Sequence, residues 1–168
     1  MCLKRWKEFK PTDEYLSVIN QLDTVEKLHD FMETFTYKSD KIKILIWSFP
    51  WDNWQTPVET MRLRTGDCED MARFAVDVLV RVLKIYETRF IAYTGEKIGC
   101  GHSVAAFPYH GNNVNLKDKL SVFSNNNLIY TDSYLDLGHL FFKGLKAMEV
   151  RDWTGKVLER KIKLFGTF

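Results

Sequence analysis

The pattern of hydrophobic and polar positions predicts two short helices near the start of the chain. Apolar residues recur at helical spacing over residues 12–22 and again over residues 24–35, so each helix should bury one face. Thr24 stands where the second helix needs an N-cap. We expect residues 1–36 to form an N-terminal helical brace. The apolar positions are Tyr15, Leu16, Ile19, Leu22, Val25, Leu28, Phe31, Met32 and Phe35.

Two more helices are predicted in the middle of the chain. Thr56, Pro57 and Glu59 have the spacing of a capping box with proline at the first helical position, which predicts a short helix over residues 57–62. A longer helix begins at Asp67 or Cys68, and most of one side is apolar. It should therefore be buried near the centre of the domain. Its apolar positions are Met71, Ala72, Phe74, Ala75, Val78, Leu79, Val82 and Leu83.

After this helix the hydrophobic pattern changes to a period of two, which is typical of strands. The helices come first and an antiparallel sheet follows, which indicates an α+β domain. We expect a single domain over residues 1–168, with its core in residues 54–168. Strands are predicted over residues 89–94, 102–109, 119–124 and 128–133, with a final strand or pair across 147–164 and turns at 125–127 and 154–155.

Composition fits one soluble globular domain, since 45% of the 168 residues are hydrophobic and 27% are charged. The net charge of +2 gives no reason to expect a nucleic-acid partner. The most apolar stretches, residues 42–50 and 137–142, are too short to span a membrane. No apolar run of signal-peptide length follows the basic N-terminal residues, so we expect a cytoplasmic protein. Its three cysteines fit free thiols in a reducing compartment.

Cys68 is the first candidate for chemistry, because it falls at the start of the predicted buried helix. A thiol there meets unpaired backbone amides and the positive end of the helix dipole, and both favour the thiolate. His102 at the start of a strand could act as its base. Asp132 at the end of another strand could orient that base.

Three acidic neighbours act against a thiolate at this position. Asp67, Glu69 and Asp70 surround Cys68 with negative charge, which raises the pKa of a thiol. Their simplest roles are structural, since Asp67 is a natural N-cap and acidic residues stabilise the first turn of a helix. An active Cys68 would therefore depend on His102.

Four segments of the sequence match a known pattern in combination. They are residues 54–59, residues 66–72, residues 101–104 and the aspartate after a strand, Asp132. Together they resemble the bacterial transglutaminase-like cysteine peptidase group of the papain-related superfamily, over residues 24–134. The resemblance implies a central helix bearing Cys68, packed on an antiparallel sheet that bears His102 and Asp132. By resemblance these are the nucleophile, the general base and the orienting acid.

The resemblance also suggests supporting residues. The oxyanion would be bound by the Cys68 backbone amide and by the Gln55 side chain, with the Trp54 indole as an alternative to Gln55. Trp51 and Trp54 either pack in the core or form an apolar wall of the substrate groove.

Some members of the resembled group bind calcium near the catalytic cysteine, where Asp67 and Glu69 stand in this chain. Calcium takes six to eight oxygen ligands, and two carboxylates fall far short of that number. We therefore expect no metal or cofactor, and we keep calcium near these two residues as the alternative to helix capping.

These features predict thiol-dependent acyl chemistry on peptide or glutamine amides, in the first place by a cysteine protease or amidohydrolase acting on a peptide or protein substrate. The same Cys-His-Asp triad would serve a transglutaminase or a deamidase. We favour hydrolysis, because the chain extends little beyond the core. The alternative of another class is a catalytically inactive transglutaminase-like binding or scaffold module.

Overall fold

A computed structural model describes residues 8–39, 41–44, 47–50, 54–96, 101–108 and 119–162, with the backbone alone for residues 41–44 and 47–50. The helices in these segments are α1 (Asp13–Ile19), α2 (Val25–Glu33), α3 (Pro57–Leu63), α4 (Cys68–Arg81) and α5 (Tyr134–Phe141). The strands are β1 (Thr36–Tyr37), β2 (Lys41–Ile44), β3 (Trp47–Pro50), β4 (Thr65–Gly66), β5 (Arg89–Gly95), β6 (Gly101–Phe107), β7 (Leu120–Ser124), β8 (Asn127–Thr131), β9 (Leu145–Arg151) and β10 (Val157–Ile162). None of the helices in this described part is long and apolar enough to cross a membrane.

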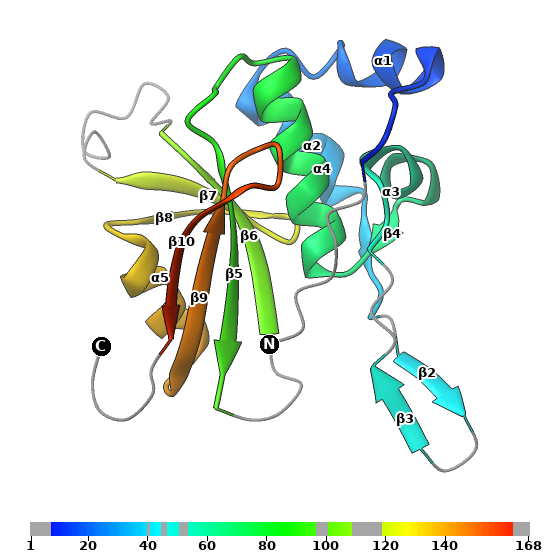
Figure 1. Cartoon of the computed structure of the whole chain (residues 1–168). Coiled ribbons are helices and arrows are strands. Elements are labelled where there is room, and N and C mark those ends of the chain that lie inside the picture. The colour runs from blue at the N-terminus through cyan, green and yellow to red at the C-terminus, as the bar shows by residue number, and fades with distance from the viewer. Residues whose placement is uncertain are drawn as a thin grey trace.

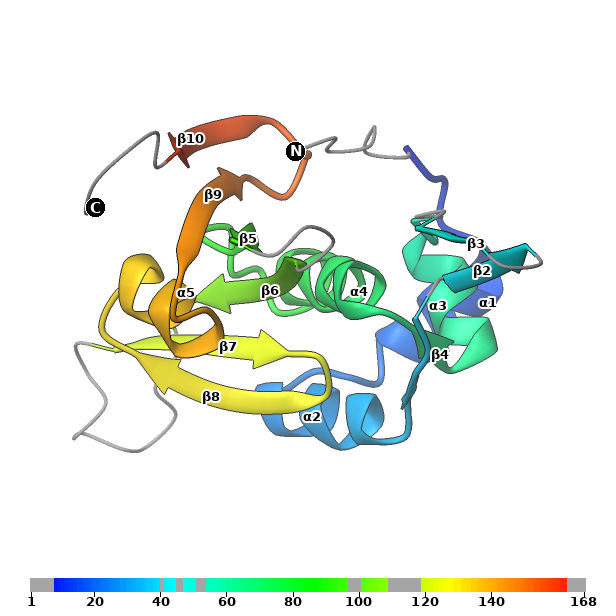
Figure 2. The ribbon, with the colours of Figure 1, turned by 90° about the horizontal axis from the view of Figure 1, so that it is seen from below.

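A six-stranded antiparallel sheet organises the molecule, in the order β10-β9-β5-β6-β7-β8. Helix α4 packs on one face of the sheet and α5 lies on the other (Figures 1 and 2). This arrangement confirms the predicted α+β class, with the helix that bears Cys68 against an antiparallel sheet.

The local rules that predicted the first four helices operate in the structure. The Thr24 side chain accepts a hydrogen bond from the Lys27 amide, and Thr56 and Glu59 form the predicted capping box. The strands predicted over residues 89–133 are β5 to β8, and the final pair is β9 and β10. The last predicted residues of two strands, 109 and 163–164, lie outside the described residues.

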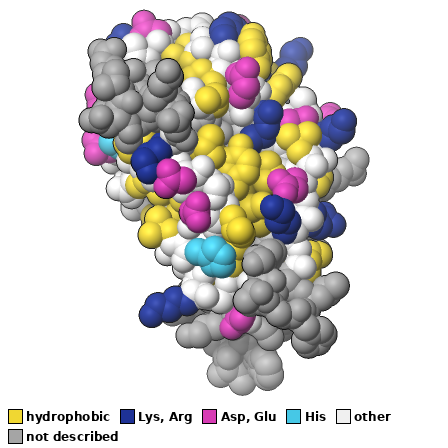
Figure 3. Space-filling view, turned by 90° about the vertical axis from the view of Figure 1, so that its left-hand side faces the viewer, with side chains coloured by type: hydrophobic (Ala, Val, Ile, Leu, Met, Phe, Trp, Pro, Cys, Tyr) yellow, Lys and Arg dark blue, Asp and Glu magenta, His cyan; other side chains and the backbone are white. Residues whose placement is uncertain are grey.

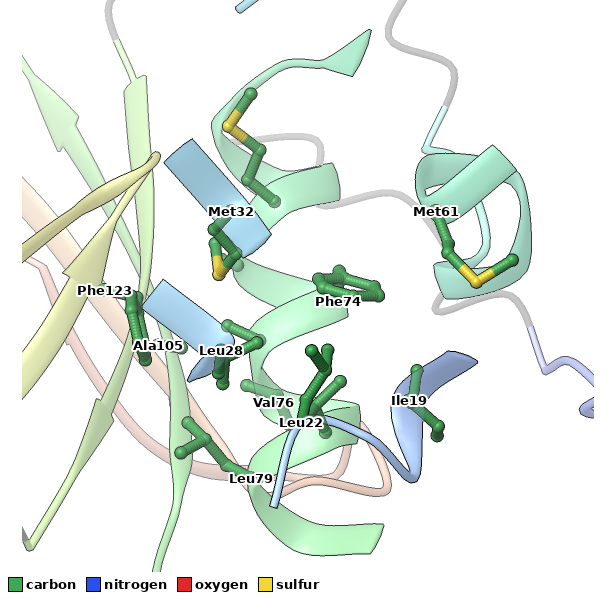
Figure 4. Packing of buried hydrophobic residues seen from close by; sticks show 14 of the residues in the cluster. Ile19, Leu22, Leu28, Met32, Met61, Phe74, Val76, Leu79, Ala105 and Phe123 are labelled. Atoms are coloured by element: carbon green, nitrogen blue, oxygen red, sulfur yellow. The ribbon is translucent and has the colours of Figure 1, made fainter. Parts of the chain in front are cut away.

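Helix α4 is buried on both sides, which explains its largely apolar sequence. Its Phe74 ring is fully buried and stacks on Phe31 of α2 at 5.8 Å, while Phe35 lies 5.2 Å away. Figure 4 shows Leu28 and Met32 of α2 packing against the same helix. The two N-terminal helices thus complete the core around α4.

The hydrophobic pattern did not predict helix α5, which follows directly after the strand predicted over residues 128–133. Ser133 is its N-cap and accepts a hydrogen bond from the Asp136 amide at 3.1 Å. The helix buries Leu137 on the second face of the sheet, beside Tyr93. Serine followed three residues later by an acidic residue was the signal for this start.

Hydrophobic side chains also gather on the outer surface. Figure 3 views the side of the molecule that carries α5, β8 and β10, and shows an apolar band between charged side chains. Exposed apolar residues of these elements are Tyr130, Leu140, Val157, Leu158 and Ile162. The apolar band is therefore formed by α5, β8 and β10, and it is separate from the helix that bears Cys68.

A short parallel pairing fixes the chain just before α4. Strand β1 pairs with β4, so that Tyr37 lies opposite Gly66. The Lys38 amide extends the pairing by donating to the Gly66 carbonyl at 2.8 Å. Strands β2 and β3 form a separate hairpin that stands away from the sheet (Figure 1). Two-residue strands carry too little pattern to be predicted from sequence.

Strand β10 is attached to β9 partly through a buried carboxylate. Glu149 of β9 is fully buried and accepts hydrogen bonds from Arg151 at 2.7 Å and from Arg160 Nε of β10 at 2.8 Å. Removing it leaves the Arg151 guanidinium buried without its partner.

We therefore expect Glu149→Ala to lower the free energy of unfolding by about 3–5 kcal/mol, the range found when one partner of a buried ion pair is removed. Urea unfolding measures the change. Glu159 of β10 pairs with Lys161 at 3.1 Å, and both side chains are nearly half exposed, so Glu159→Ala is the matched control, expected to cost less than about 1 kcal/mol. Equal losses in the two variants would contradict the buried role of Glu149.

Candidate active site

Cys68 is the first residue of α4, and only 8% of its surface is exposed. The helix begins there because Asp70 binds two backbone amides that the helix itself cannot satisfy. Its carboxylate accepts from the Asp67 amide at 3.3 Å and from the Gln55 amide at 2.7 Å. One buried side chain thus fixes both the helix start and the segment that precedes α3.

The Cys68 sulfur has two described hydrogen-bond partners. The thiol donates to Glu69 Oε2 at 3.1 Å, and the Ser103 backbone amide of β6 donates to the sulfur. Burial raises the pKa of the thiol, and the charges of Glu69 and Asp67 raise it further, while the Ser103 amide opposes them. The group is therefore a neutral thiol at neutral pH.

His102 lies on β6, one residue before the strand amide that contacts Cys68. Its Nε2 is 2.8 Å from Ser124 Oγ, and its ring packs against the Phe141 ring in a T-shaped arrangement with centroids 4.3 Å apart. Burial lowers the pKa of His102 to about 4. The imidazole is therefore neutral at neutral pH as well.

The structure thus brings Cys68 and His102 to the same end of β6, with different immediate partners. Alternate residues of a strand face opposite sides of a sheet. Ser103 and its neighbour across the ladder, Ala92, belong to the face covered by α4, whereas His102 lies beside Phe141 of α5. In this state the thiol is bonded to Glu69 and the imidazole to Ser124.

Asp132 is not brought to His102, and the expected pairing must be corrected. Strands β7 and β8 are antiparallel, so Ser124 pairs with Asn127 at the end near His102, and Thr131 pairs with Leu120 at the other end. Asp132 follows Thr131, and at about 3.3 Å per residue it lies roughly 15 Å along the sheet from the end that carries Ser124 and His102. Its side chain is 72% exposed and accepts a hydrogen bond from Lys119 at 2.8 Å.

Gln55 lies beside the first turn of α4, where an oxyanion donor would be needed. Its amide donates to Asp70, and its carbonyl accepts from Arg73 Nη1 at 2.7 Å. The side-chain Oε1 is buried, with no hydrogen-bond partner among the described residues. The backbone of Gln55 is thus fixed by α4 on both sides, and the Cys68 amide lies at the start of the same helix.

Of the two tryptophans considered for a substrate groove, Trp54 is part of the core. It is 5% exposed and packs on Phe90 with ring centroids 5.7 Å apart. The core alternative is therefore correct for Trp54, because its ring fills space beneath the sheet. Trp51 lies outside the described residues.

Two residues near the site were not found by sequence reasoning. Tyr37, 54% exposed, lies on β1 beside the chain that leads into Cys68. Partial burial of its hydroxyl raises its pKa, and the nearby acidic groups of Cys68, Asp67 and Glu69 raise it further. Ser124 contacts His102 directly. Nothing in the sequence pointed to Tyr37, but the antiparallel direction of the predicted strands could have indicated Ser124.

Comparison with known proteins identifies the class. The family described as "Transglutaminase-like domain" matches residues 7–140, and the chain belongs to this family. This confirms the transglutaminase-like group that the sequence motifs resembled. No curated protein sequence matches the chain significantly.

Solved structures of LapG from Legionella pneumophila have a similar fold. The calcium-bound form is 20% identical with a TM-score of 0.51, and the match covers 81% of this chain and 71% of that one. The EGTA-treated form is 20% identical with a TM-score of 0.50, and the match covers 81% and 72%. At this level of identity the likeness shows a common fold.

The lowered pKa of His102 predicts that stability depends on acid. As pH falls below about 6.5 the unfolded chain protonates this residue, whereas the folded chain does so only near pH 4, so the stability that His102 contributes above that window is lost as pH falls. Between about pH 7 and pH 4.5 the loss from this group should reach about 2–3 kcal/mol. Urea unfolding of wild type and His102→Gln at both pH values measures it. An identical pH dependence in the two proteins would count against a buried neutral imidazole.

The Glu69 carboxylate should slow the chemistry of the thiol. In Glu69→Gln the negative charge beside Cys68 is gone, the pKa of the thiol falls, and alkylation by iodoacetamide at about pH 8 should be faster by roughly tenfold or more. Mass spectrometry of the peptide that contains Cys68 separates it from Cys2 and Cys100. Glu33→Gln on the exposed side of α2 is the charge-matched control, and equal rates in the two variants would overturn the assignment.

Proposed function

We propose that the protein carries out thiol-dependent acyl chemistry on peptide or glutamine amides, with hydrolysis as the outcome. The observation that carries the proposal is the placement of Cys68 at the first turn of a buried helix, with its sulfur against the strand amide that follows His102. Membership of the transglutaminase-like family supports it.

In the proposed reaction Cys68 is the nucleophile and His102 the base. The thiol gives its proton to His102 as the sulfur bonds to the substrate carbonyl carbon, and the oxyanion accepts hydrogen bonds from the Cys68 amide and the Gln55 side chain. His102 then protonates the leaving amine as the C–N bond breaks, which leaves a thioester. Water, deprotonated by His102, attacks the thioester and restores the thiol.

The acceptor decides which activity results. Water acting on a peptide bond gives a protease, and water acting on a glutamine side chain gives a deamidase. An amine in place of water gives a transglutaminase. All three reactions pass through the same thioester, so Cys68 and the residues around it do not distinguish one activity from another.

A second candidate function is a binding or scaffold module without catalysis. The observation that favours it is how Cys68 and His102 are hydrogen-bonded. The Cys68 thiol donates to the Glu69 carboxylate, and the imidazole of His102 is bonded to the hydroxyl of Ser124 and not to a carboxylate. Both features work against a thiolate–imidazolium pair.

Calcium is considered because one LapG structure is calcium-bound. The described residues contain no group of three or more acidic, histidine or cysteine side chains arranged to hold a metal. Of the two carboxylates considered for calcium, a Glu69 oxygen accepts the Cys68 thiol, and Asp67 is buried as the N-cap residue of α4. These carboxylates do not fit a preassembled site for an ion that needs six to eight oxygens, so we derive no step through calcium.

A thiol-reactive peptide probe separates the two functions. Wild-type protein should be labelled at Cys68 by a peptide or glutamine-mimetic electrophile, and should release amine or ammonia from casein-derived peptides. Cys68→Ala should lose both activities, by a factor of at least about 10³ for the turnover.

Cys2 and Cys100 remain in the variant, so residual labelling reports nonspecific thiol reactivity. Equal labelling of wild type and Cys68→Ala, with no turnover by either, would leave the binding module as the function.

A further inference from the structure

The antiparallel sheet limits which residues can contact His102. Because β6 and β7 run in opposite directions, the end of β7 lies beside the beginning of β6, and Ser124 pairs with Val104. The chain then turns at Asn125, which adopts a left-handed φ of 52°. Ser124, the last residue of β7 before this turn, can therefore reach the imidazole of His102. Asp132, which follows the far end of β8, cannot.

Ser124 is buried at the point where it contacts His102. It is 8% exposed, and its Oγ lies 2.8 Å from His102 Nε2. On the same side of the sheet the imidazole meets Phe141 and the cross-strand neighbour Tyr93. Tyr93 donates its hydroxyl to the Tyr134 carbonyl at 2.7 Å and stays neutral, so Ser124 is the polar partner that these described neighbours offer.

We propose that Ser124 is the positioning residue of His102, accepting a hydrogen bond from Nε2–H so that Nδ1 is the nitrogen that carries the lone pair and acts as the base. This inference rests on the proposed function and assigns to a serine the place that sequence reasoning gave to Asp132.

The direction of this hydrogen bond decides whether His102 can be a base. A neutral imidazole carries one proton, and the partner of one nitrogen determines which nitrogen holds it. If Nε2 donates to Ser124, Nδ1 carries the lone pair and is the basic nitrogen of the ring. A serine also differs from a carboxylate in charge: it fixes the tautomer without stabilising the imidazolium, so the pKa of His102 stays low.

Nitrogen NMR of histidine in the full chain tests the assignment. Spectra of protein labelled with ¹⁵N-histidine should show His102 as the Nε2–H tautomer in wild type. Ser124→Ala should convert it to a mixture or to the Nδ1–H tautomer. Ser124→Asn, whose amide oxygen can still accept, should keep the wild-type tautomer, and Ser124→Asp should raise the pKa of His102 by at least about one unit.

Two controls are matched to this series. Ser121 lies on the same strand, fully buried and away from His102, so Ser121→Ala makes the same chemical change elsewhere. Asp132→Asn tests the rejected partner. Both should leave the tautomer and the pKa of His102 unchanged. A wild-type spectrum in Ser124→Ala, or a shift in Asp132→Asn, would overturn the proposal.

The rate of Cys68 labelling gives a separate functional readout. Ser124→Ala should lower it at least about tenfold and move its pH profile, and Ser124→Asn should restore it. If Cys68 is unreactive in every variant while the NMR shifts follow the series, the proposed function fails and the positioning of His102 by Ser124 stands. If labelling is strong and independent of Ser124, the positioning fails and the proposed function stands.

Discussion

The candidate site depends on one fully buried carboxylate, that of Asp70. Its two oxygens accept amides from segments on both sides of α3, at Gln55 and at Asp67, and neither amide has an alternative partner within a helix. The close approach also requires Gly66, because a Cβ there would lie 2.7 Å from the Asp70 Cβ. Without this arrangement the first turn of α4, the Cys68 thiol and Gln55 would not lie in one place.

The residues that define the start of α4 also control the chemistry of its first residue. Acidic side chains in a first turn stabilise a helix by roughly 0.3–1 kcal/mol each. The same negative charge acts on the buried Cys68 sulfur and, with burial, outweighs the favourable helix dipole and the Ser103 amide, so the pKa of the thiol is raised. Local stability and thiolate formation therefore oppose each other at this turn.

Sequence patterns predicted what depends on local interactions. The capping box at Thr56 and the apolar face around Phe74 were sufficient to locate α3 and α4. The expected pairing of Asp132 with His102 was wrong because the direction of each strand was not followed along the chain. Strands over residues 119–124 and 128–133 are joined by a short turn and are therefore antiparallel, which places Asp132 at the end of the sheet away from His102. The parallel pairing of Tyr37 with Gly66 joins segments far apart in sequence, and no local sequence pattern predicts such a pairing.

The two neutral groups define what activation has to achieve. Moving the Cys68 proton to His102 would create two charges in a buried place, next to the Glu69 carboxylate and opposite an uncharged serine. The carboxylate disfavours the thiolate, and the serine gives the imidazolium no compensating charge. Under the proposed chemistry Glu69 must therefore leave the sulfur before the proton moves.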